Sequence, residues 1–161
     1  MELYGKHRYT DLIQPYTQLS DTSCSAASLH MAYKALGKNY FEEGIMEQFD
    51  TEHRGYAEWE DLIMHPGTVR FTSFVFTDCG YDLLREIYEY HGFPTIVLWS
   101  PNHNHEDVSH FSPIKIVNHE KITIADPYYG DMETLSRKSF IRAWRNDKIL
   151  VVGPPNSILK L

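Results

Sequence analysis

The chain has 161 residues, 42% of them hydrophobic, which is enough to bury a core and predicts a single domain over residues 1–161. Fifteen basic residues against 22 acidic ones give a net charge of −7, and no run of Lys or Arg suits a phosphate backbone, which excludes nucleic acid as a partner. There is no apolar signal region and no membrane segment. We therefore expect a soluble, cytoplasmic protein with two reduced cysteines.

The segment before Cys24 and the helix that begins there form the most informative part of the chain. Residues 1–17 predict an extended lead-in, because Pro15 prevents one helix from running through them. Serine and aspartate within positions 20–23 can cap a helix, and apolar residues then recur at helical spacing up to Gly37, which is suited to end it. A cysteine in the first turn faces free backbone N–H groups and the positive end of the helix dipole. Both favour the nucleophilic thiolate.

Gln18 lies six positions before Cys24, on the incoming loop. From there its side-chain amide can fold over the thiol and form an oxyanion hole with the backbone N–H of Cys24. The alternative is that Cys24 is a small buried residue, which is the usual state of a lone cysteine. The assignment of Cys24 as a nucleophile therefore depends on partners further along the chain.

The next part of the chain predicts secondary structure without an evident chemistry. Residues 40–49 and 57–65 have the periodicity of amphipathic helices, and Pro66 is expected to end the second of them. Residues 69–77 are rich in β-branched and aromatic side chains and predict a strand. After this strand, an apolar stripe that ends at Gly92 predicts another helix.

Cys79 is a second candidate for the nucleophile, because it also precedes a predicted helix. The residue six positions before it is Ser73 rather than an amide, and Gly80 and Tyr81 differ from the small residues that follow Cys24. We therefore assign the nucleophile to Cys24.

The loop at residues 100–109 is rich in potential metal ligands, and His110 follows it directly. Their spacing matches no zinc signature, and a loop this polar is typical of a solvent-exposed segment. We therefore expect no metal and no other cofactor. The ligand-type residues of this loop are His103, His105, Glu106 and Asp107.

Two predicted strands, at residues 111–117 and 122–126, form a hairpin that brings His110 close to Asp126. With a three-residue loop, position 112 pairs with position 126, so the two residues are diagonal neighbours within reach of their side chains. Pro113 cannot donate a ladder hydrogen bond, which implies an edge strand or a bulge. Taken singly, His110 is an ordinary strand residue and Asp126 an ordinary turn residue. Their order after an amide and a thiol is what indicates catalysis.

Further residues form a pattern with the amide, thiol, imidazole and carboxylate, namely Ala27, Leu29, Met31, Gly37, Phe111, Pro127, Gly130, Phe140 and Trp144. Together they resemble the papain-like cysteine peptidases of the C39 group, which process bacteriocins. The resemblance implies that Phe140 and Trp144 lie on a closing helix. It departs from the group at Ser23 and Ser25, where an aspartate and a glycine are usual, and these changes bear on substrate specificity.

The resemblance implies an α+β protein with the papain-like fold, in which an N-terminal helical part carries the nucleophile helix and packs on a C-terminal antiparallel sheet. Catalysis would use Cys24 as the nucleophile, His110 as the base and Asp126 as the residue that orients it. Gln18 would help to bind the oxyanion. The implied substrate is a peptide or protein, in this group typically a leader peptide cleaved after two small residues. Two alternatives stay open: an acyl or peptidyl transferase that uses the same thioester, and a peptide-binding module without catalysis.

Overall fold

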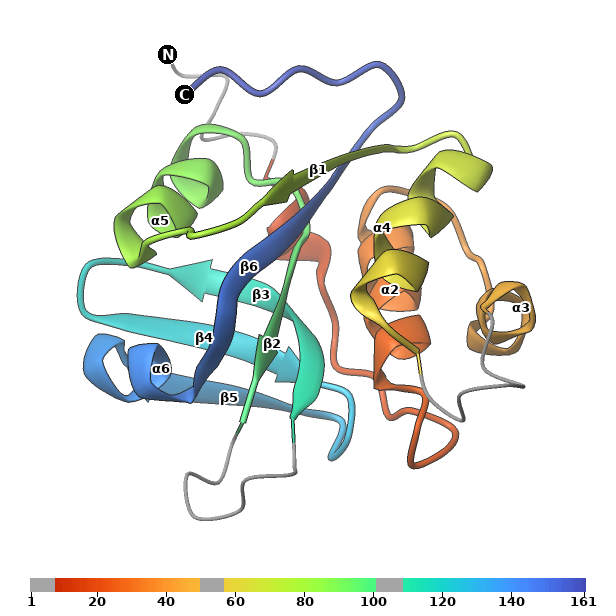
Figure 1. The fold of residues 1–161 in the computed structure, drawn as a ribbon, viewed down its shortest axis with the longest axis horizontal. Helices are drawn as coiled ribbons and strands as arrows, with labels where there is room; N and C mark the ends of the chain where they lie inside the picture. Colours follow the sequence, from red (N-terminus) through yellow and green to blue (C-terminus); the bar gives the residue numbers. More distant parts are fainter. Residues whose placement is uncertain (1–7, 50–56, 101–108) are drawn as a thin grey trace.

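The computed structural model describes residues 8–49, 57–100 and 109–161 as a sheet with helices on both faces (Figure 1). The helices are α2 (Cys24–Ala35), α3 (Glu42–Gln48), α4 (Trp59–Thr68), α5 (Tyr81–Tyr90) and α6 (Arg137–Ala143), preceded by the 3₁₀ turn η1 (Tyr9–Leu12). The strands are β1 (Thr72–Phe76), β2 (Thr95–Trp99), β3 (His110–Val117), β4 (Lys121–Asp126), β5 (Asp131–Ser136) and β6 (Trp144–Gly153). The predicted α+β class is confirmed. Within the described residues, no helix combines the length and apolar character needed to cross a membrane.

The strands form one antiparallel sheet in the order β1-β6-β2-β3-β4-β5. Helices α2, α3 and α4 lie together on the right in Figure 1, and α5 and α6 lie on the left. Side chains alternate between these two sides, so Ile96 of β2 joins the core under α2 and α4, whereas Val97 joins the core with α5 and α6. The helical part that contains Cys24 therefore packs on an antiparallel sheet, as the family resemblance implied.

The helix α2 ends in the left-handed cap that Gly37 predicts. Gly37 has a φ of +90°, and its N–H bonds the carbonyl of Lys34 at 3.0 Å. The N–H of Lys38 reaches back to the carbonyl of Tyr33 at 2.9 Å. These two bonds satisfy carbonyls that would otherwise lack a partner at the helix end.

The helix α4 continues past its predicted stop at Pro66, to Thr68. Its last turn is tightened, because the N–H groups of Val69 and Arg70 bond the carbonyls three residues earlier. The missing N–H of proline does not interrupt these bonds, which explains why the helix does not end at Pro66.

The C-terminal part of the chain differs most from the sequence prediction. Phe140 lies in α6, but Trp144 begins β6, so the expectation that both lie on one closing helix was wrong. Neither β5 nor β6 was predicted. Residues 149–152 of β6 are all buried, because this strand lies between β1 and β2 and is covered on both faces. Such a strand shows no alternation of apolar and polar residues.

Strands β3 and β4 form the predicted hairpin, with one change of register. Next to the loop, Val117 pairs with Ile122, whereas a three-residue loop predicts that it pairs with Lys121. A bulge after Ile114 restores the predicted register, in which Ile114 pairs with Ile124. Because β3 lies between β2 and β4, the bulge rather than an edge position accompanies Pro113.

The lead-in segment runs between α2 and the turn that follows β4. Its Ile13 packs with Met31 of α2 and Ala125 of β4. Gly130 in that turn has a φ of +72°, and Thr17 lies so close that a Cβ at position 130 would overlap its hydroxyl. Glycine meets both requirements because it has no Cβ. This close approach fixes the lead-in beside the end of β4.

We predict that Gly130→Ala lowers the free energy of unfolding by at least about 1 to 2 kcal/mol, because alanine is strained at positive φ and meets Thr17. Urea unfolding measures the change. The matched control is Gly44→Ala in α3, where a Cβ meets nothing within 4 Å. That variant should gain up to about 1 kcal/mol of stability from helix propensity. Equal stability changes in the two variants would contradict the packing of the lead-in described above.

Candidate active site

His110 and Asp126 lie side by side in the protein interior, at one end of β3 and β4. His110 is 5% exposed and Asp126 is 1% exposed. The Nδ1 atom of His110 lies 3.2 Å from Oδ1 of Asp126. Because an ionised carboxylate only accepts hydrogen bonds, Nδ1 carries the hydrogen and Nε2 is left as the acceptor of the neutral ring. In this tautomer Nε2 is ready to take a proton.

The carboxylate of Asp126 also holds a turn. Its Oδ1 accepts the N–H of Tyr128 at 2.9 Å, and its backbone carbonyl accepts the N–H of Gly130 at 2.9 Å. Asp126 thus opens the kind of turn that its position before Pro127 indicates. Its second carboxylate oxygen, Oδ2, is buried and has no hydrogen-bond partner within the described part of the chain.

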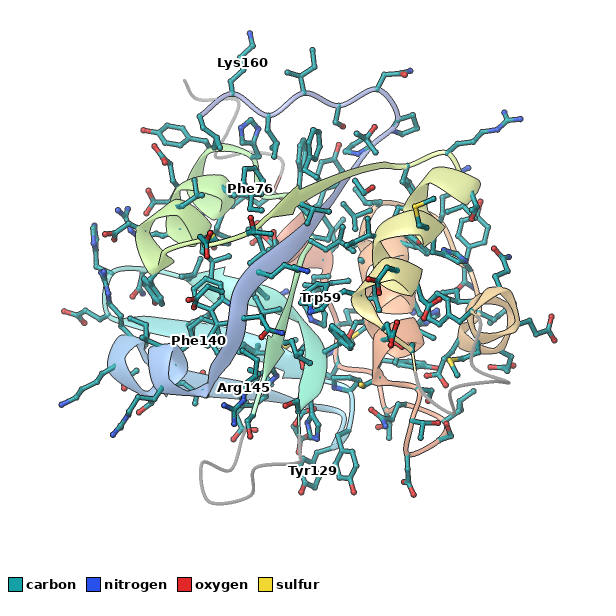
Figure 2. All side chains as sticks on the ribbon, in the orientation of Figure 1. Trp59, Phe76, Tyr129, Phe140, Arg145 and Lys160 are labelled. Carbon is teal, nitrogen blue, oxygen red and sulfur yellow. The ribbon has the colours of Figure 1, made fainter. Side chains whose placement is uncertain are left out.

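Two aromatic rings enclose the imidazole of His110. Tyr128 stacks on it, with 4.9 Å between ring centroids and 20° between planes, and Trp99 meets it edge-on at 6.3 Å. Tyr128 and its neighbour Tyr129 are both exposed, and Figure 2 shows Tyr129 at the outer edge of the molecule. The stacking ring therefore shields one face of the imidazole while staying at the surface. Sequence reasoning missed Tyr128, although an aromatic pair directly after Asp126 and Pro127 is a usable signal.

Cys24 occupies the first position of α2, against the start of β3. The backbone of Phe111, the residue after His110, and that of Ser25 lie close enough to the thiol to favour its thiolate form. One turn further along α2, the hydroxyl of Ser28 donates to the carbonyl of Phe111 at 2.8 Å. These contacts bring the thiol to the same end of the sheet as His110.

Burial raises the pKa of the Cys24 thiol, which is opposite to the effect expected from the helix start alone. The backbone contacts with Phe111 and Ser25 favour the thiolate, and the negative charge of Asp126 disfavours it. Desolvation is the largest of these effects. The thiol is therefore protonated at neutral pH unless a base accepts its proton. The imidazole on the residue before Phe111 is a suitable base.

Cys79 belongs to the core on the opposite face of the sheet and is 1% exposed. Its thiol donates to the carbonyl of Gly80, with 3.4 Å between sulfur and oxygen. Burial, together with the negative charge of Asp147, raises the pKa of Cys79 to about 12. These are the features of an unreactive structural cysteine.

Gln18 is tied by its backbone to the turn after Asp126, because its N–H donates to the carbonyl of Pro127 at 2.8 Å. Its side-chain Nε2 donates to the carbonyl of Ser20 at 2.6 Å. An amide nitrogen carries two hydrogens, so the second remains for another acceptor. The loop that carries Gln18 is thus joined to the residue after Asp126, and the start of α2 lies against the residue after His110.

A cavity of about 460 Å³ opens beside Phe111, on the α2 face of the sheet. Trp59 meets Phe111 edge-to-face at 4.9 Å, and the ammonium of Lys148 lies 5.5 Å from the centre of the Trp59 ring. Figure 2 shows Trp59 between α4 and the sheet. Sequence reasoning placed Trp59 on a core face and did not find this cavity. Its walls are formed by Ala57, Glu58, Trp59, Glu60, Leu98, Phe111 and Lys148.

No group of three or more His, Cys, Asp or Glu residues is arranged to hold a metal within residues 8–49, 57–100 and 109–161. The loop residues considered as ligands, His103, His105, Glu106 and Asp107, lie outside the described residues. His110 is described, and its Nδ1 atom is engaged by Asp126.

A cysteine at the start of a helix that packs against an antiparallel sheet is the arrangement of the papain-like cysteine peptidases. The sequence model of the Peptidase C39 family matches residues 13–157. The chain therefore belongs to the Peptidase C39 family and is a cysteine-type peptidase. No curated protein sequence matches the chain.

Three solved structures show the same fold. The peptidase domain of Streptococcus ComA, a bifunctional ABC transporter of a quorum-sensing pathway, superposes with a TM-score of 0.74 at 17% identity over 88% of this chain and 98% of that one. A double glycine motif protease from an AMS/PCAT transporter, in complex with the leader peptide, superposes with a TM-score of 0.71 at 18% identity. The match covers 89% of this chain and 93% of that one. A C39-like peptidase from Bacillus anthracis superposes with a TM-score of 0.69 at 15% identity. The match covers 91% of this chain and 96% of that one.

We predict that iodoacetamide at pH 7 alkylates Cys24 well before Cys79. Cys24 is half-buried, and its thiol lies against Phe111, the residue after His110. Cys79 is buried, and its pKa is raised to about 12. Peptide mapping by mass spectrometry identifies the modified residue.

The control for this experiment is His110→Ala. Because burial raises the pKa of Cys24, removal of the base should suppress alkylation at pH 7 and shift the rate increase above the ordinary thiol pKa. Preferential alkylation of Cys79 would show that the wrong cysteine has been chosen.

Proposed function

We propose that the chain hydrolyses peptide bonds with Cys24 as the nucleophile, His110 as the general base and Asp126 as the residue that orients the imidazole. Gln18 and the backbone N–H of Cys24 bind the oxyanion. The observation that carries this proposal is the buried hydrogen bond between Nδ1 of His110 and Oδ1 of Asp126, beside the strand residue that contacts the thiol.

In the first step, the Cys24 proton passes to Nε2 of His110 as sulfur attacks the carbonyl carbon of the scissile bond. The new C–S bond places a negative charge on the carbonyl oxygen. The backbone N–H of Cys24 and the free amide hydrogen of Gln18 stabilise this charge. Asp126 stabilises the imidazolium that forms at the same time, because the Nδ1 hydrogen stays directed at its carboxylate.

The tetrahedral intermediate then collapses. The C–N bond breaks, Nε2 of His110 gives its proton to the leaving amine, and a thioester remains on Cys24. Water attacks the thioester carbon while His110 accepts a proton from it. Cleavage of the C–S bond releases a carboxylic acid and returns the proton to the thiol.

The substrate we propose is an extended peptide with two glycines before the scissile bond. The support is the structural neighbour that is a double glycine motif protease bound to its leader peptide. The cavity beside Phe111 can accept an apolar side chain of such a peptide, because Trp59, Leu98 and the Phe111 ring form part of its walls. A synthetic peptide with two consecutive glycines is therefore the probe for the assays below.

We predict that Asp126→Asn lowers kcat on this peptide by orders of magnitude with little loss of stability. Both the Tyr128 N–H and Nδ1 of His110 are bonded to Oδ1, so an asparagine oxygen in that place keeps the turn, but the neutral amide lacks the negative charge that stabilises the imidazolium. Peptide cleavage followed by mass spectrometry, together with thermal unfolding, gives both quantities.

His110→Ala gives the upper limit for the loss of the base in that experiment. The double variant should be barely slower than His110→Ala, because residues that act as a unit are not additive. Full activity of Asp126→Asn would reduce the proposed triad to Cys24 and His110, with Asp126 only a turn residue.

We predict that Gln18→Ala lowers kcat by roughly 10² to 10³, the usual scale for the loss of one oxyanion donor. The backbone N–H that bonds Pro127 is kept, so the loop should stay in place and the melting temperature should change little. Unchanged turnover would remove Gln18 from the mechanism.

A further inference from the structure

The segment that carries Gln18 has little apolar packing to hold it. Leu19 is 61% exposed, and residues 20–22 are exposed as well. The position of the Gln18 amide therefore depends on hydrogen bonds to the backbone around it. One of these is the bond from the Gln18 N–H to Pro127, on the side of the turn after β4.

The other hydrogen bond that holds this segment is accepted by a residue of α3. Glu42, the first residue of that helix, is 2% exposed. Both of its carboxylate oxygens lie within hydrogen-bonding distance of the backbone nitrogen of Leu19, Oε2 at 3.0 Å and Oε1 at 3.3 Å. Gln18 is thus held between two backbone hydrogen bonds, one at its own N–H and one at the next N–H.

Tyr16 holds the carboxylate of Glu42 in turn. Burial, followed by the negative charges of Glu42 and Glu43, raises the pKa of Tyr16 to about 12. The hydroxyl therefore stays protonated and donates its hydrogen bond to Glu42. The ring of Tyr16 packs on His30 of α2, with 4.4 Å between centroids. A buried carboxylate is costly unless its partners are in place, so these contacts fix where Glu42 directs its oxygens.

We propose that Glu42 is a positioning residue for catalysis, which acts by holding the oxyanion-binding loop through the N–H of Leu19. This inference rests on the proposed role of Gln18. An apolar side chain would fill the same buried space without the cost of burying a charge, but it would give the Leu19 N–H no acceptor. Small displacements of a catalytic group lower the rate without preventing substrate binding, so the effect belongs in kcat rather than in KM.

The test measures kcat and KM on the synthetic peptide with two consecutive glycines. Glu42→Ala should lower kcat by roughly 10- to 100-fold with little change in KM, as expected for a misplaced catalytic group. Glu42→Gln should retain most of kcat, because its amide oxygen can still accept from Leu19 and its nitrogen can donate to the Tyr16 hydroxyl. Glu43→Ala is the matched control, an exposed glutamate in the same helical turn that should leave kcat unchanged.

A double-mutant cycle separates positioning from a merely structural role. If Glu42 acts through the Gln18 loop, Glu42→Ala should cause no further loss of kcat in a Gln18→Ala background. A full additional loss there, or equal impairment of Glu42→Gln and Glu42→Ala, would overturn the inference. If Glu42→Ala does not fold, Glu42→Asp replaces it, since it keeps the charge but is one methylene too short to reach Leu19. Its kcat should fall below that of Glu42→Gln, and the opposite order would also overturn the inference.

The outcomes distinguish this inference from the proposed function. Normal kcat in Gln18→Ala would remove both the oxyanion role and the inference. A low kcat in Gln18→Ala combined with normal kcat in Glu42→Ala would remove the inference alone and leave the proposed mechanism intact.

Discussion

The hydrogen bond from the hydroxyl of Ser28 to the carbonyl of Phe111 joins the two halves of this molecule. Ser28 is fully buried in α2, and Phe111 lies at the start of β3, so a lost partner would leave a polar group unsatisfied in the interior. The bond ties the second turn of α2 to the strand that begins with His110. The position of Cys24, one turn before Ser28, is therefore set by the same contact.

Local patterns in the sequence predicted the elements that carry the site. The helix from Cys24 to the cap at Gly37 follows from periodicity and capping, and the β3-β4 hairpin follows from two apolar runs separated by a short loop. The strand β6 could not be predicted, because residues buried on both faces lack alternation and its place in the sheet depends on distant partners. Glu42 was missed for a similar reason, since only the fold brings it to a loop 23 residues away in sequence.

The state of the Cys24 thiol depends on two opposing effects. The helix start and the backbone of Ser25 favour the thiolate and follow from local sequence, whereas the backbone of Phe111 also favours it but is brought there by the fold. Desolvation raises the pKa and is larger, but it follows from packing against β3, which the sequence does not reveal. A nucleophile that is neutral until a base takes its proton is also less exposed to oxidation than a permanent thiolate, because oxidants react with the thiolate form.

The order of the strands has a consequence for how this peptidase is made. The last strand, β6, fills the position between β1 and β2, and it is the neighbour of β1 in the sheet. Until residues 144–153 have left the ribosome, β2 has an open edge and β1 has no strand beside it. Pairings between such distant segments are slow to form. A nascent chain that already carries Cys24, His110 and Asp126 would therefore lack a finished core, and its hydrolytic activity would be withheld until β6 has been synthesised and has paired with β1 and β2.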